Sequence, residues 1–362
     1  MTRLNVGLLF GGRSGEHEVS LKSAFSIANA LNKEKYNIIP IAIAKNGKWY
    51  APINIEDIKE FSPEGYLGNE VTILPQPNTG LINLAKNTSI VILDVIFPII
   101  HGTNGEDGTL QGLLEMTGIP YVGAGVLGSA VGMDKVIMKK IFAYTNLPQV
   151  KFSYIFRSQI QRELKEVTNK LVSELNFPMF VKPANLGSSV GISKANNIDS
   201  LQNALIEAAK YDSKIIIEEG IEVREIEISV LGNENPQASI PGEIIPCNEF
   251  YDYNAKYIDD KSVLKIPAQL DEIMVANLKK LAVDAYLALD CAGLARIDFF
   301  ICKKTGQIFI NEVNTLPGFT SISMYPKLWE HSGIKMEDLL DKLIDLAFDK
   351  FKDKVKNKTD YL

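Results

Sequence analysis

Cysteine is scarce in this chain, which has 3 cysteines in 362 residues. Cys247, Cys291 and Cys302 share no spacing typical of a metal site, and an odd number of thiols does not suit a disulfide framework. The sequence therefore excludes a thiolate metal centre and a disulfide-stapled secreted domain. It favours a protein that works in a reducing compartment.

Long apolar runs are also missing. The longest run, at residues 90–100, is interrupted by Asp94 and Pro98. It is much shorter than the ~20 residues that a membrane-spanning helix needs. The first residues hold too little continuous apolar sequence for a secretory signal. We therefore expect a cytoplasmic protein with no membrane partner.

Positive charge is in the minority. Lysine and arginine number 38 against 44 aspartates and glutamates, which gives a formal net charge of −6 at pH 7. No long basic stripe precedes the lysine-rich residues 350–358, which we expect to be a solvated helix end. A nucleic-acid partner is therefore excluded as the main function. With 46% hydrophobic residues, the chain can bury the cores of about two or three globular domains.

The early glycine-rich loop gives only weak support for a common nucleotide-binding motif. The chain has no G-x-x-x-x-G-K-[ST] segment, and the early GGRSGE lacks the G-x-G-x-x-G spacing of a dinucleotide site. Nucleotide binding must therefore use another scaffold. One candidate is the turn NLGSSVG after Lys182, whose flexible backbone N–H groups can close over phosphates. A flexible hairpin without a ligand is the alternative interpretation of that turn.

Glycine-rich loops follow apolar strands in the first third of the chain. GGRSGEHE precedes a helical pattern over about residues 19–31, and HGTNGEDG follows a later strand. Open α/β sheets bind ligands where strands end, so His17 and His101 on these loops are candidate site residues. We expect a mostly parallel, covered sheet with strands at residues 4–10, 37–44 and 89–100.

The rest of the chain alternates between helical and extended patterns. Residues 45–88 are irregular and contain several prolines, and we expect an insertion or peripheral hairpins there. Hydrophobic periodicity predicts helices at residues 126–144, 157–175, 198–210 and 271–289 and from 335 onward, and strands at 178–183, 215–220 and 224–231.

Residues 294–325 contain the clearest chemical pattern. Two runs rich in Ile and Phe flank a glycine-containing turn, which predicts a β-hairpin. Asp298 then lies opposite Glu312. Arg296 lies opposite Asn314, and the period-two alternation of side chains puts all four residues on one face.

The chemistry of that face points to a phosphate-bearing ligand. Two acids and an amide offer only oxygen donors, a set that suits Mg²⁺. Arg296 adds a fixed cation, which an anionic phosphate would explain. The loop that follows, TLPGFTSIS, supplies hydroxyls and backbone N–H groups for a substrate. The other face of the hairpin, with Ile297, Phe299 and Ile301, is apolar. The alternative is a surface hairpin whose acids simply face water.

In their order along the chain, these segments closely resemble the D-alanine–D-alanine ligases of the ATP-grasp superfamily. The resemblance runs nearly end to end through GGRSGEHEVS, HGTNGEDGTLQG, MDK, VKPANLGSSVGISK, YDYNAKY, GLARIDFF and NEVNTLPGFTS. It implies a three-domain α/β ATP-grasp fold. The domains would be an open parallel-sheet domain at residues 1–124, a central domain at 125–217 and a C-terminal domain at 218–362.

The resemblance also implies the activity and its ligands. ATP would lie between the central and C-terminal domains with two Mg²⁺ or Mn²⁺, and two D-alanines would be joined through a D-alanyl phosphate for peptidoglycan synthesis. The protein would be a homodimer with the N-terminal domain as the expected interface.

The implied site residues fall into three groups. ATP would contact Lys135, Lys182, Ser189, Glu218, Glu219, Glu225, Phe250 and Lys256. The metals would be held by Asp298, Glu312 and Asn314. The substrates and the reaction would involve Glu16 at the first ammonium, His101 beside it, Ser188 and Tyr257 in loop closure, Arg296 and the Gly318 N–H at the oxyanion, and Ser323 with Met324 at the second D-alanine.

Three other functions remain to be compared with this one. A different ATP-grasp ligase would share the metal face but has no reason to keep Glu16 with Ser188 and Tyr257. A D-alanine–D-lactate ligase is less favoured, because such relatives tend to carry histidine where this chain has Tyr257. A non-catalytic nucleotide-binding module should have lost a metal ligand or Arg296, and all of these are present.

Overall fold

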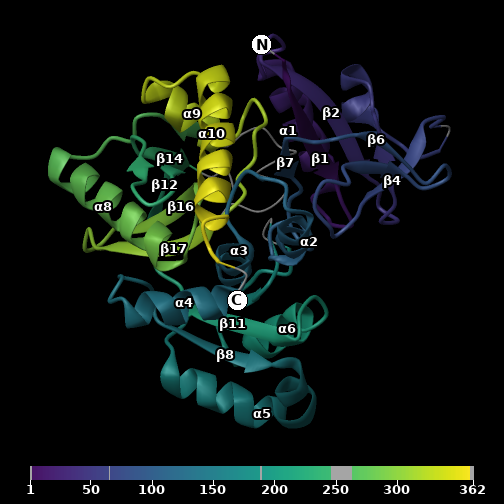
Figure 1. Cartoon of the computed structure of the whole chain (residues 1–362). Helices are drawn as coiled ribbons and strands as arrows, with labels where there is room; N and C mark the ends of the chain where they lie inside the picture. The colour runs from purple at the N-terminus through teal and green to yellow at the C-terminus, as the bar shows by residue number, and fades with distance from the viewer. Residues whose placement is uncertain (1, 65, 188–189, 246–262, 359–362) are drawn as a thin grey trace.

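The computed structural model describes residues 2–64, 66–187, 190–245 and 263–358 of the chain. Three β-sheets with their helices form three α/β lobes (Figure 1). None of the helices in these ranges is both long and apolar enough to cross a membrane.

The first sheet is mixed. Its strand order is β6-β5-β4-β3-β2-β1-β7. The predicted parallel strands are confirmed as β1 (Leu4–Gly11), β2 (Tyr36–Ile43) and β7 (Val95–Ile99). The prediction of a mostly parallel sheet is wrong, because residues 45–91 extend the sheet with antiparallel strands. These strands are β3 (Trp49–Ala51), β4 (Asn69–Ile73), β5 (Leu81–Asn83) and β6 (Thr88–Val91). A 3-10 helix, η1 (Ile55–Glu60), lies between β3 and β4.

A break at Asp94 divides the single strand predicted at residues 89–100. The Asp94 carboxylate accepts a hydrogen bond of 2.7 Å from the Asn5 N–H, and the Asp94 N–H donates one of 2.9 Å to the Asn5 carbonyl. These bonds fix the start of β1 against the start of β7. Residues 88–91, before Asp94, therefore do not continue β7. They pair with β5 as β6, at the opposite edge of the sheet.

Helices from both ends of the chain cover one face of the first sheet. Apolar residues of β1 pack with α1 (His17–Ala30) and with α10 (Met336–Lys354) in one core. Figure 1 shows α10 running along the boundary between the first and third lobes. The opposite face packs against α2 (Thr109–Thr117).

The solvated helix end predicted for residues 350–358 is confirmed at residues 352–358, which are exposed, but Lys350 is partly buried. The Lys350 ammonium donates a 2.6 Å hydrogen bond to the Gly123 carbonyl and lies 4.0 Å from the centroid of the Tyr121 ring. Lys354 forms an ion pair with Glu115. Lys350 follows Ala347 by three residues, so helical geometry places it on the inner face of α10.

The second sheet has the order β10-β9-β11-β8 and is antiparallel throughout. Its strands are β8 (Phe152–Phe156), β9 (Met179–Pro183), β10 (Ser193–Ala195) and β11 (Lys214–Glu219). Helices α5 (Arg157–Glu174) and α6 (Ile198–Ala208) cover one face, which confirms both helix predictions. The predicted boundary after residue 217 falls within β11, which continues to Glu219.

The helix predicted at residues 126–144 is in fact two helices, α3 (Val126–Met133) and α4 (Lys135–Tyr144). Asp134 breaks it by taking an extended conformation and capping α4. Its carboxylate accepts hydrogen bonds from the N–H groups of Val136 and Ile137 at 3.0 and 3.1 Å. It also pairs with Lys214 of β11. The break makes Lys135 the first residue of a new helix.

The third sheet has the order β15-β14-β12-β16-β17, with β13 paired to β12. Its antiparallel strands are β12 (Val223–Gly232), β13 (Gln237–Ala238), β14 (Gly242–Ile245), β15 (Val263–Lys265), β16 (Gly293–Cys302) and β17 (Ile308–Asn314). Helices α4 and α8 (Glu272–Ala288) pack on its apolar face, and α9 (Met324–His331) follows β17. On the other face, Met324 and Leu328 of α9 pack against Ile244 of β14.

Candidate active site

The hairpin of β16 and β17 has the predicted register. Arg296 pairs with Asn314, and Asp298 pairs with Glu312. Ile297, Phe299 and Ile301 lie in the core beneath, as predicted. The four polar residues therefore share the opposite face of the sheet.

A β-bulge lies beside this polar group. The register shifts between Asp298 and Phe299, and Phe299 pairs with Ile310, so Asn311 has no paired residue. Asn311 and Glu312 both line the same cavity. Bulges change the direction of neighbouring side chains and are frequent beside active sites. The symmetric hairpin expected from the sequence could not reveal this extra residue.

Arg296 is held by two carboxylates. Its Nε and Nη2 lie 2.7 Å from the two oxygens of Asp298, and Nε lies 3.0 Å from Glu227 Oε2. Burial alone would lower the pKa of Arg296, but Asp298 and Glu227 outweigh this effect and raise its pKa well above the usual value. Glu227 was not predicted as a site residue. The alternation in REIEIS, which puts Glu225 and Glu227 on one face of β12, was the signal for it.

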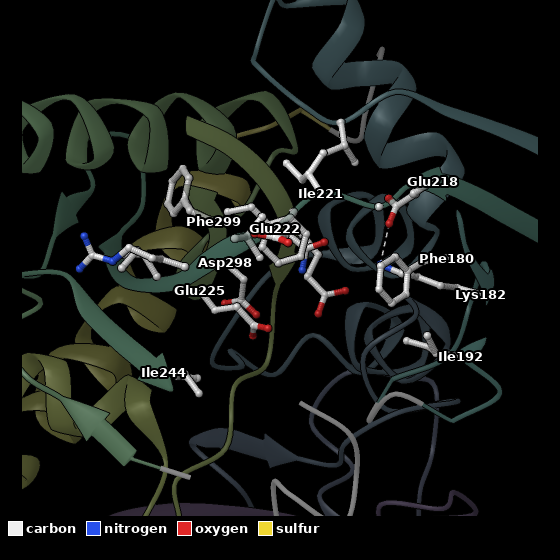
Figure 2. A pocket seen from close by; sticks show the side chains of 18 of the residues that line it. Phe180, Lys182, Ile192, Glu218, Ile221, Glu222, Glu225, Ile244, Asp298 and Phe299 are labelled. Atoms are coloured by element: carbon white, nitrogen blue, oxygen red, sulfur yellow. Dashed lines mark ion pairs between the residues drawn. The ribbon is translucent and has the colours of Figure 1, made fainter. Parts of the chain in front are cut away.

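A cavity of about 720 Å³ lies between the second and third sheets. In Figure 2, Lys182 and Glu218 come from one wall, and Glu225 and Asp298 from the other. Lys135 and Glu312 also line it, and apolar surface is contributed by Phe180, Ile192 and Ile221. The cavity thus combines an apolar surface for a flat ring with opposed rows of cations and acids.

A buried cluster of two lysines and one glutamate forms the wall at β9 and β11. Glu218 Oε2 lies 2.6 Å from Lys182 Nζ, the dashed contact of Figure 2, and Glu218 Oε1 lies 2.8 Å from Lys139 Nζ. Burial would raise the pKa of Glu218, but the two lysines lower it to about 2. Lys139 was missed in the sequence. Lys139 follows Lys135 by four residues and so lies on the same face of the helix. Because Lys140 is adjacent, the sequence did not show which of the two lysines is buried.

Lys135 joins the two walls. Its Nζ donates a 3.0 Å hydrogen bond to the Leu186 carbonyl and lies 3.3 Å from Glu312 Oε2. Glu312 is therefore paired with a cation, as Asp298 is with Arg296. In the described part of the chain, no three His, Cys, Asp or Glu side chains are arranged to hold a metal ion.

The donor set still fits a hard cation. Asp298, Glu312 and the amide oxygen of Asn314 are on one face of the hairpin, and all three offer oxygen. Mg²⁺ and Mn²⁺ prefer such donors. The amide oxygen of Asn314 now accepts a hydrogen bond of 3.1 Å from the Leu316 N–H.

Glu16 lies in a narrow space formed by two glycines from different lobes. A Cβ atom at Gly102 would come within 2.7 Å of Glu16 Oε2, and one at Gly187 within 2.8 Å of the same atom. Any side chain at either position would displace the carboxylate. The loop after β1, the loop after β7 and the turn after β9 therefore meet at Glu16, as the sequence motifs suggested.

His101 connects this region to the loop after β17. Its Nδ1 lies 3.1 Å from the Leu316 carbonyl, and its Nε2 lies 3.3 Å from Ser23 Oγ. Ser23 Oγ accepts a 3.2 Å hydrogen bond from the Phe319 N–H. Neutral imidazole satisfies both contacts by donating from Nδ1 and accepting at Nε2. His101 therefore fixes the position of the backbone around Gly318.

This burial predicts a pH dependence of stability. Burial lowers the pKa of His101 below its ordinary value of 6.5. Below pH 6.5 the unfolded chain binds a proton that the folded chain does not, so His101 should lower the free energy of unfolding as the pH falls. We expect urea denaturation between pH 7 and pH 5 to show a smaller loss for His101→Gln than for the wild type.

The exposed His331 provides the matched control. His331→Gln should follow the wild-type pH profile. Equal pH profiles for His101→Gln and the wild type would contradict the burial argument.

Ser323 and Gly318 are also brought together. A Cβ atom at Gly318 would lie 2.8 Å from Ser323 Oγ, and that oxygen accepts a 3.0 Å hydrogen bond from the Thr320 N–H. Ser323 precedes the first turn of α9 without capping it. The side chain of Met324 is packed with Ile244 and Leu328 in the core, so only its backbone can face a ligand.

Two other candidates make contacts within the fold. Glu219 lines the cavity, and its carboxylate accepts hydrogen bonds of 2.8 and 2.9 Å from the backbone and side-chain nitrogens of Asn176. His17 is buried, with its Nδ1 2.8 Å from the Gly12 carbonyl, so it stabilises its own loop. The remaining predicted site residues, Ser188, Ser189, Phe250, Lys256 and Tyr257, lie outside the described residues.

Comparison with known proteins gives matches along the chain. Residues 5–124 match the family model for the D-ala D-ala ligase N-terminus, and residues 141–345 match the one for the D-ala D-ala ligase C-terminus. A D-alanine–D-alanine ligase of Natranaerobius thermophilus is 50% identical over 362 residues, which cover 100% of this chain and 99% of that protein.

Solved structures are similar as well. The D-alanine–D-alanine ligase from Coxiella burnetii is 36% identical with a TM-score of 0.86, covering 98% of this chain and 97% of that one. The VanG D-Ala:D-Ser ligase from Enterococcus faecalis is 35% identical with a TM-score of 0.86, covering 96% of this chain and 100% of that one.

Proposed function

The chain belongs to the D-alanine–D-alanine ligase family, and we propose that it joins two D-alanines into D-alanyl-D-alanine with conversion of ATP to ADP and phosphate. The dipeptide would serve peptidoglycan precursor synthesis. The observation that carries this proposal is the cavity between the second and third sheets, where Lys135 and Lys182 lie across from an oxygen-rich face.

The charges of the cavity support a bound nucleotide. Lys135 and Lys182 would contact the phosphates, Glu218 with Glu219 would lie at the base, and Glu225 at the ribose. Asp298, Glu312 and Asn314 would hold two Mg²⁺ or Mn²⁺, which when bound neutralise charge on the transferring phosphoryl group. Contacts of Ser189, Phe250 and Lys256 with ATP stay predictions from the sequence.

The reaction would proceed in two steps. A carboxylate oxygen of the first D-alanine attacks the γ-phosphorus of ATP, and the bond to ADP breaks, which leaves an acyl phosphate. The amine of the second D-alanine then attacks the acyl carbon, and phosphate leaves after a tetrahedral oxyanion has formed. Arg296 and the Gly318 N–H would stabilise that oxyanion, because fixed donors act strongly where charge develops.

The substrates would lie between the loops that meet at Glu16. Glu16 would accept the ammonium of the first D-alanine, beside His101. Ser323, with the backbone of Met324, would bind the carboxylate of the second. Ser188 and Tyr257 would close the site, which protects an acyl phosphate from hydrolysis.

The assembly and location follow from the same proposal. We place the domains at residues 1–124, 125–219 and 220–362, with the second boundary moved past the end of β11. A homodimer through the first domain and a cytoplasmic location, where ATP is available, complete the proposal.

A product assay tests the function. Phosphate release from ATP and Mg²⁺ would be measured with D-alanine, with L-alanine, and with D-alanine plus D-serine or D-lactate, and products would be identified by mass. We expect release that needs D-alanine and yields the D-alanyl dipeptide. If the main product were D-alanyl-D-serine or a D-alanyl-D-lactate ester, the second substrate would be D-serine or D-lactate and not D-alanine. No release with any mixture would overturn the proposed reaction.

A further inference from the structure

Lys139 is a buried cation that the proposed reaction does not use. Only 1% of its side chain is exposed, and its Nζ lies 2.8 Å from Glu218. Its Nζ is also 5.7 Å from the centroid of the Phe152 ring. Beyond Glu218, the described residues offer this nitrogen no hydrogen-bond acceptor. Burying an ammonium with one partner costs free energy, so the position calls for a specific role.

Glu218 is shared between this inner lysine and one at the cavity. Oε1 faces Lys139, and Oε2 faces Lys182 at 2.6 Å. The side chain of Lys182 is 12% exposed and lines the cavity, whereas Lys139 lies behind the wall. The cluster therefore has one cation that a ligand can reach and one that it cannot.

A phosphate group in the cavity would compete with Glu218 for Lys182. When Lys182 turns to the phosphate, Glu218 loses one of its two cations while it stays buried. A buried carboxylate without a cation is strongly unfavourable and takes up a proton instead. Lys139 cannot follow Lys182, because α4 and the packing around it hold it in place.

We propose that Lys139 is a positioning residue for nucleotide binding, which keeps Glu218 ionised and in place when Lys182 turns from Glu218 to the phosphates. This inference rests on the proposed function. Glu218 Oε2, released by Lys182, is then open to accept a hydrogen bond from an amino group of the base. Adenine carries such a group at the position where guanine carries a carbonyl, so Lys139 also supports selection of the base.

The test is calorimetric binding of ADP to Lys139→Met, in two buffers of different ionisation enthalpy. Methionine keeps much of the length and removes the charge. We expect the affinity for ADP to fall about 10- to 100-fold, because Lys182 must now leave Glu218 without a cation. We also expect uptake of about one proton per ADP, whereas the wild type takes up almost none.

Two further variants make the result specific. Lys140→Met removes the neighbouring, exposed lysine, which contacts the Tyr154 hydroxyl at 3.1 Å, and should bind ADP as the wild type does. In a Glu218→Gln background, adding Lys139→Met should change ADP affinity less than threefold, about the limit of independent effects. This double variant lacks the buried ion pair altogether, so it remains informative if the single variant does not fold.

The outcomes separate the inference from the function it rests on. Wild-type affinity for ADP in Lys139→Met would overturn the inference and leave the proposed function standing. Weaker binding without proton uptake would also overturn it, since lost packing alone would explain that result. A further large loss on adding Lys139→Met to Glu218→Gln would do the same. Failure of the wild type to bind ADP would instead overturn the proposed function.

Discussion

Glu312→Gln is expected to lower kcat for phosphate release by about 10³-fold or more. Glutamine keeps the size of the side chain and one oxygen donor but removes the negative charge opposite Asp298. A metal site that loses one charge holds its cation less tightly and stabilises the phosphoryl group less. The measurement is phosphate release at saturating ATP, D-alanine and Mg²⁺.

The fold should survive this change. Glu312 is half-buried, and Lys135 keeps its 3.0 Å hydrogen bond to the Leu186 carbonyl without it. ADP binding measured without divalent cations should therefore stay close to the wild-type value. The exposed Glu330, on α9, is the matched control, and Glu330→Gln should retain full activity. Near-normal turnover in Glu312→Gln would show that the oxygen-rich face of the hairpin holds no metal.

Arg296→Gln should affect both stability and turnover. The variant leaves Glu227 and Asp298 facing each other without the guanidinium that lies 3.0 and 2.7 Å from their oxygens. Removing one member of a buried charge cluster typically costs about 3–5 kcal/mol of the free energy of unfolding. We also expect kcat to fall by about 10²- to 10³-fold, the usual effect of losing one oxyanion donor.

Two comparisons distinguish these effects. Arg224 makes a similar two-contact pair with Glu243 at 2.7 and 2.8 Å, but 31% of its side chain is exposed. Urea denaturation should therefore show a smaller loss for Arg224→Gln, because solvent screens the exposed pair. Arg296→Lys should recover much of the stability but less of the turnover, since lysine keeps the charge and loses the planar fork. A stability loss for Arg296→Gln no greater than that for Arg224→Gln would contradict the buried cluster.

The sequence predicted the hairpin face because local rules determine it. Asp298 and Glu312 are opposite because strand alternation and a short turn leave few registers. The helices at α5, α6 and α8 were equally predictable, since each has one apolar face. The role of Glu16 was implied only by the family resemblance, and the fold alone shows that Gly102 and Gly187 meet beside its carboxylate.

Other features depended on contacts between distant residues. Nothing local distinguishes Lys139 from Lys140, and burial against Glu218 of β11 decides which of them is inside. The sequence around Asp134 predicts one continuous helix. The break occurs because the Asp134 carboxylate pairs with Lys214 and accepts hydrogen bonds from the first N–H groups of α4. The peripheral hairpins predicted at residues 45–88 are confirmed, but their joining to the first sheet was not predictable, because it depends on pairing with the edge of β2. Asn311 became a bulge only through the shifted pairing of β16 and β17.

The position of α10 has a consequence for how the protein is made. Strands β1, β2 and β7 are complete within the first hundred residues, yet part of the cover of their apolar face is α10, at residues 336–354. A ribosome therefore releases the first lobe with that face partly bare and supplies the missing helix only after residues 336–354 have been made. The first lobe cannot finish folding before then, and during that interval it depends on protection from aggregation.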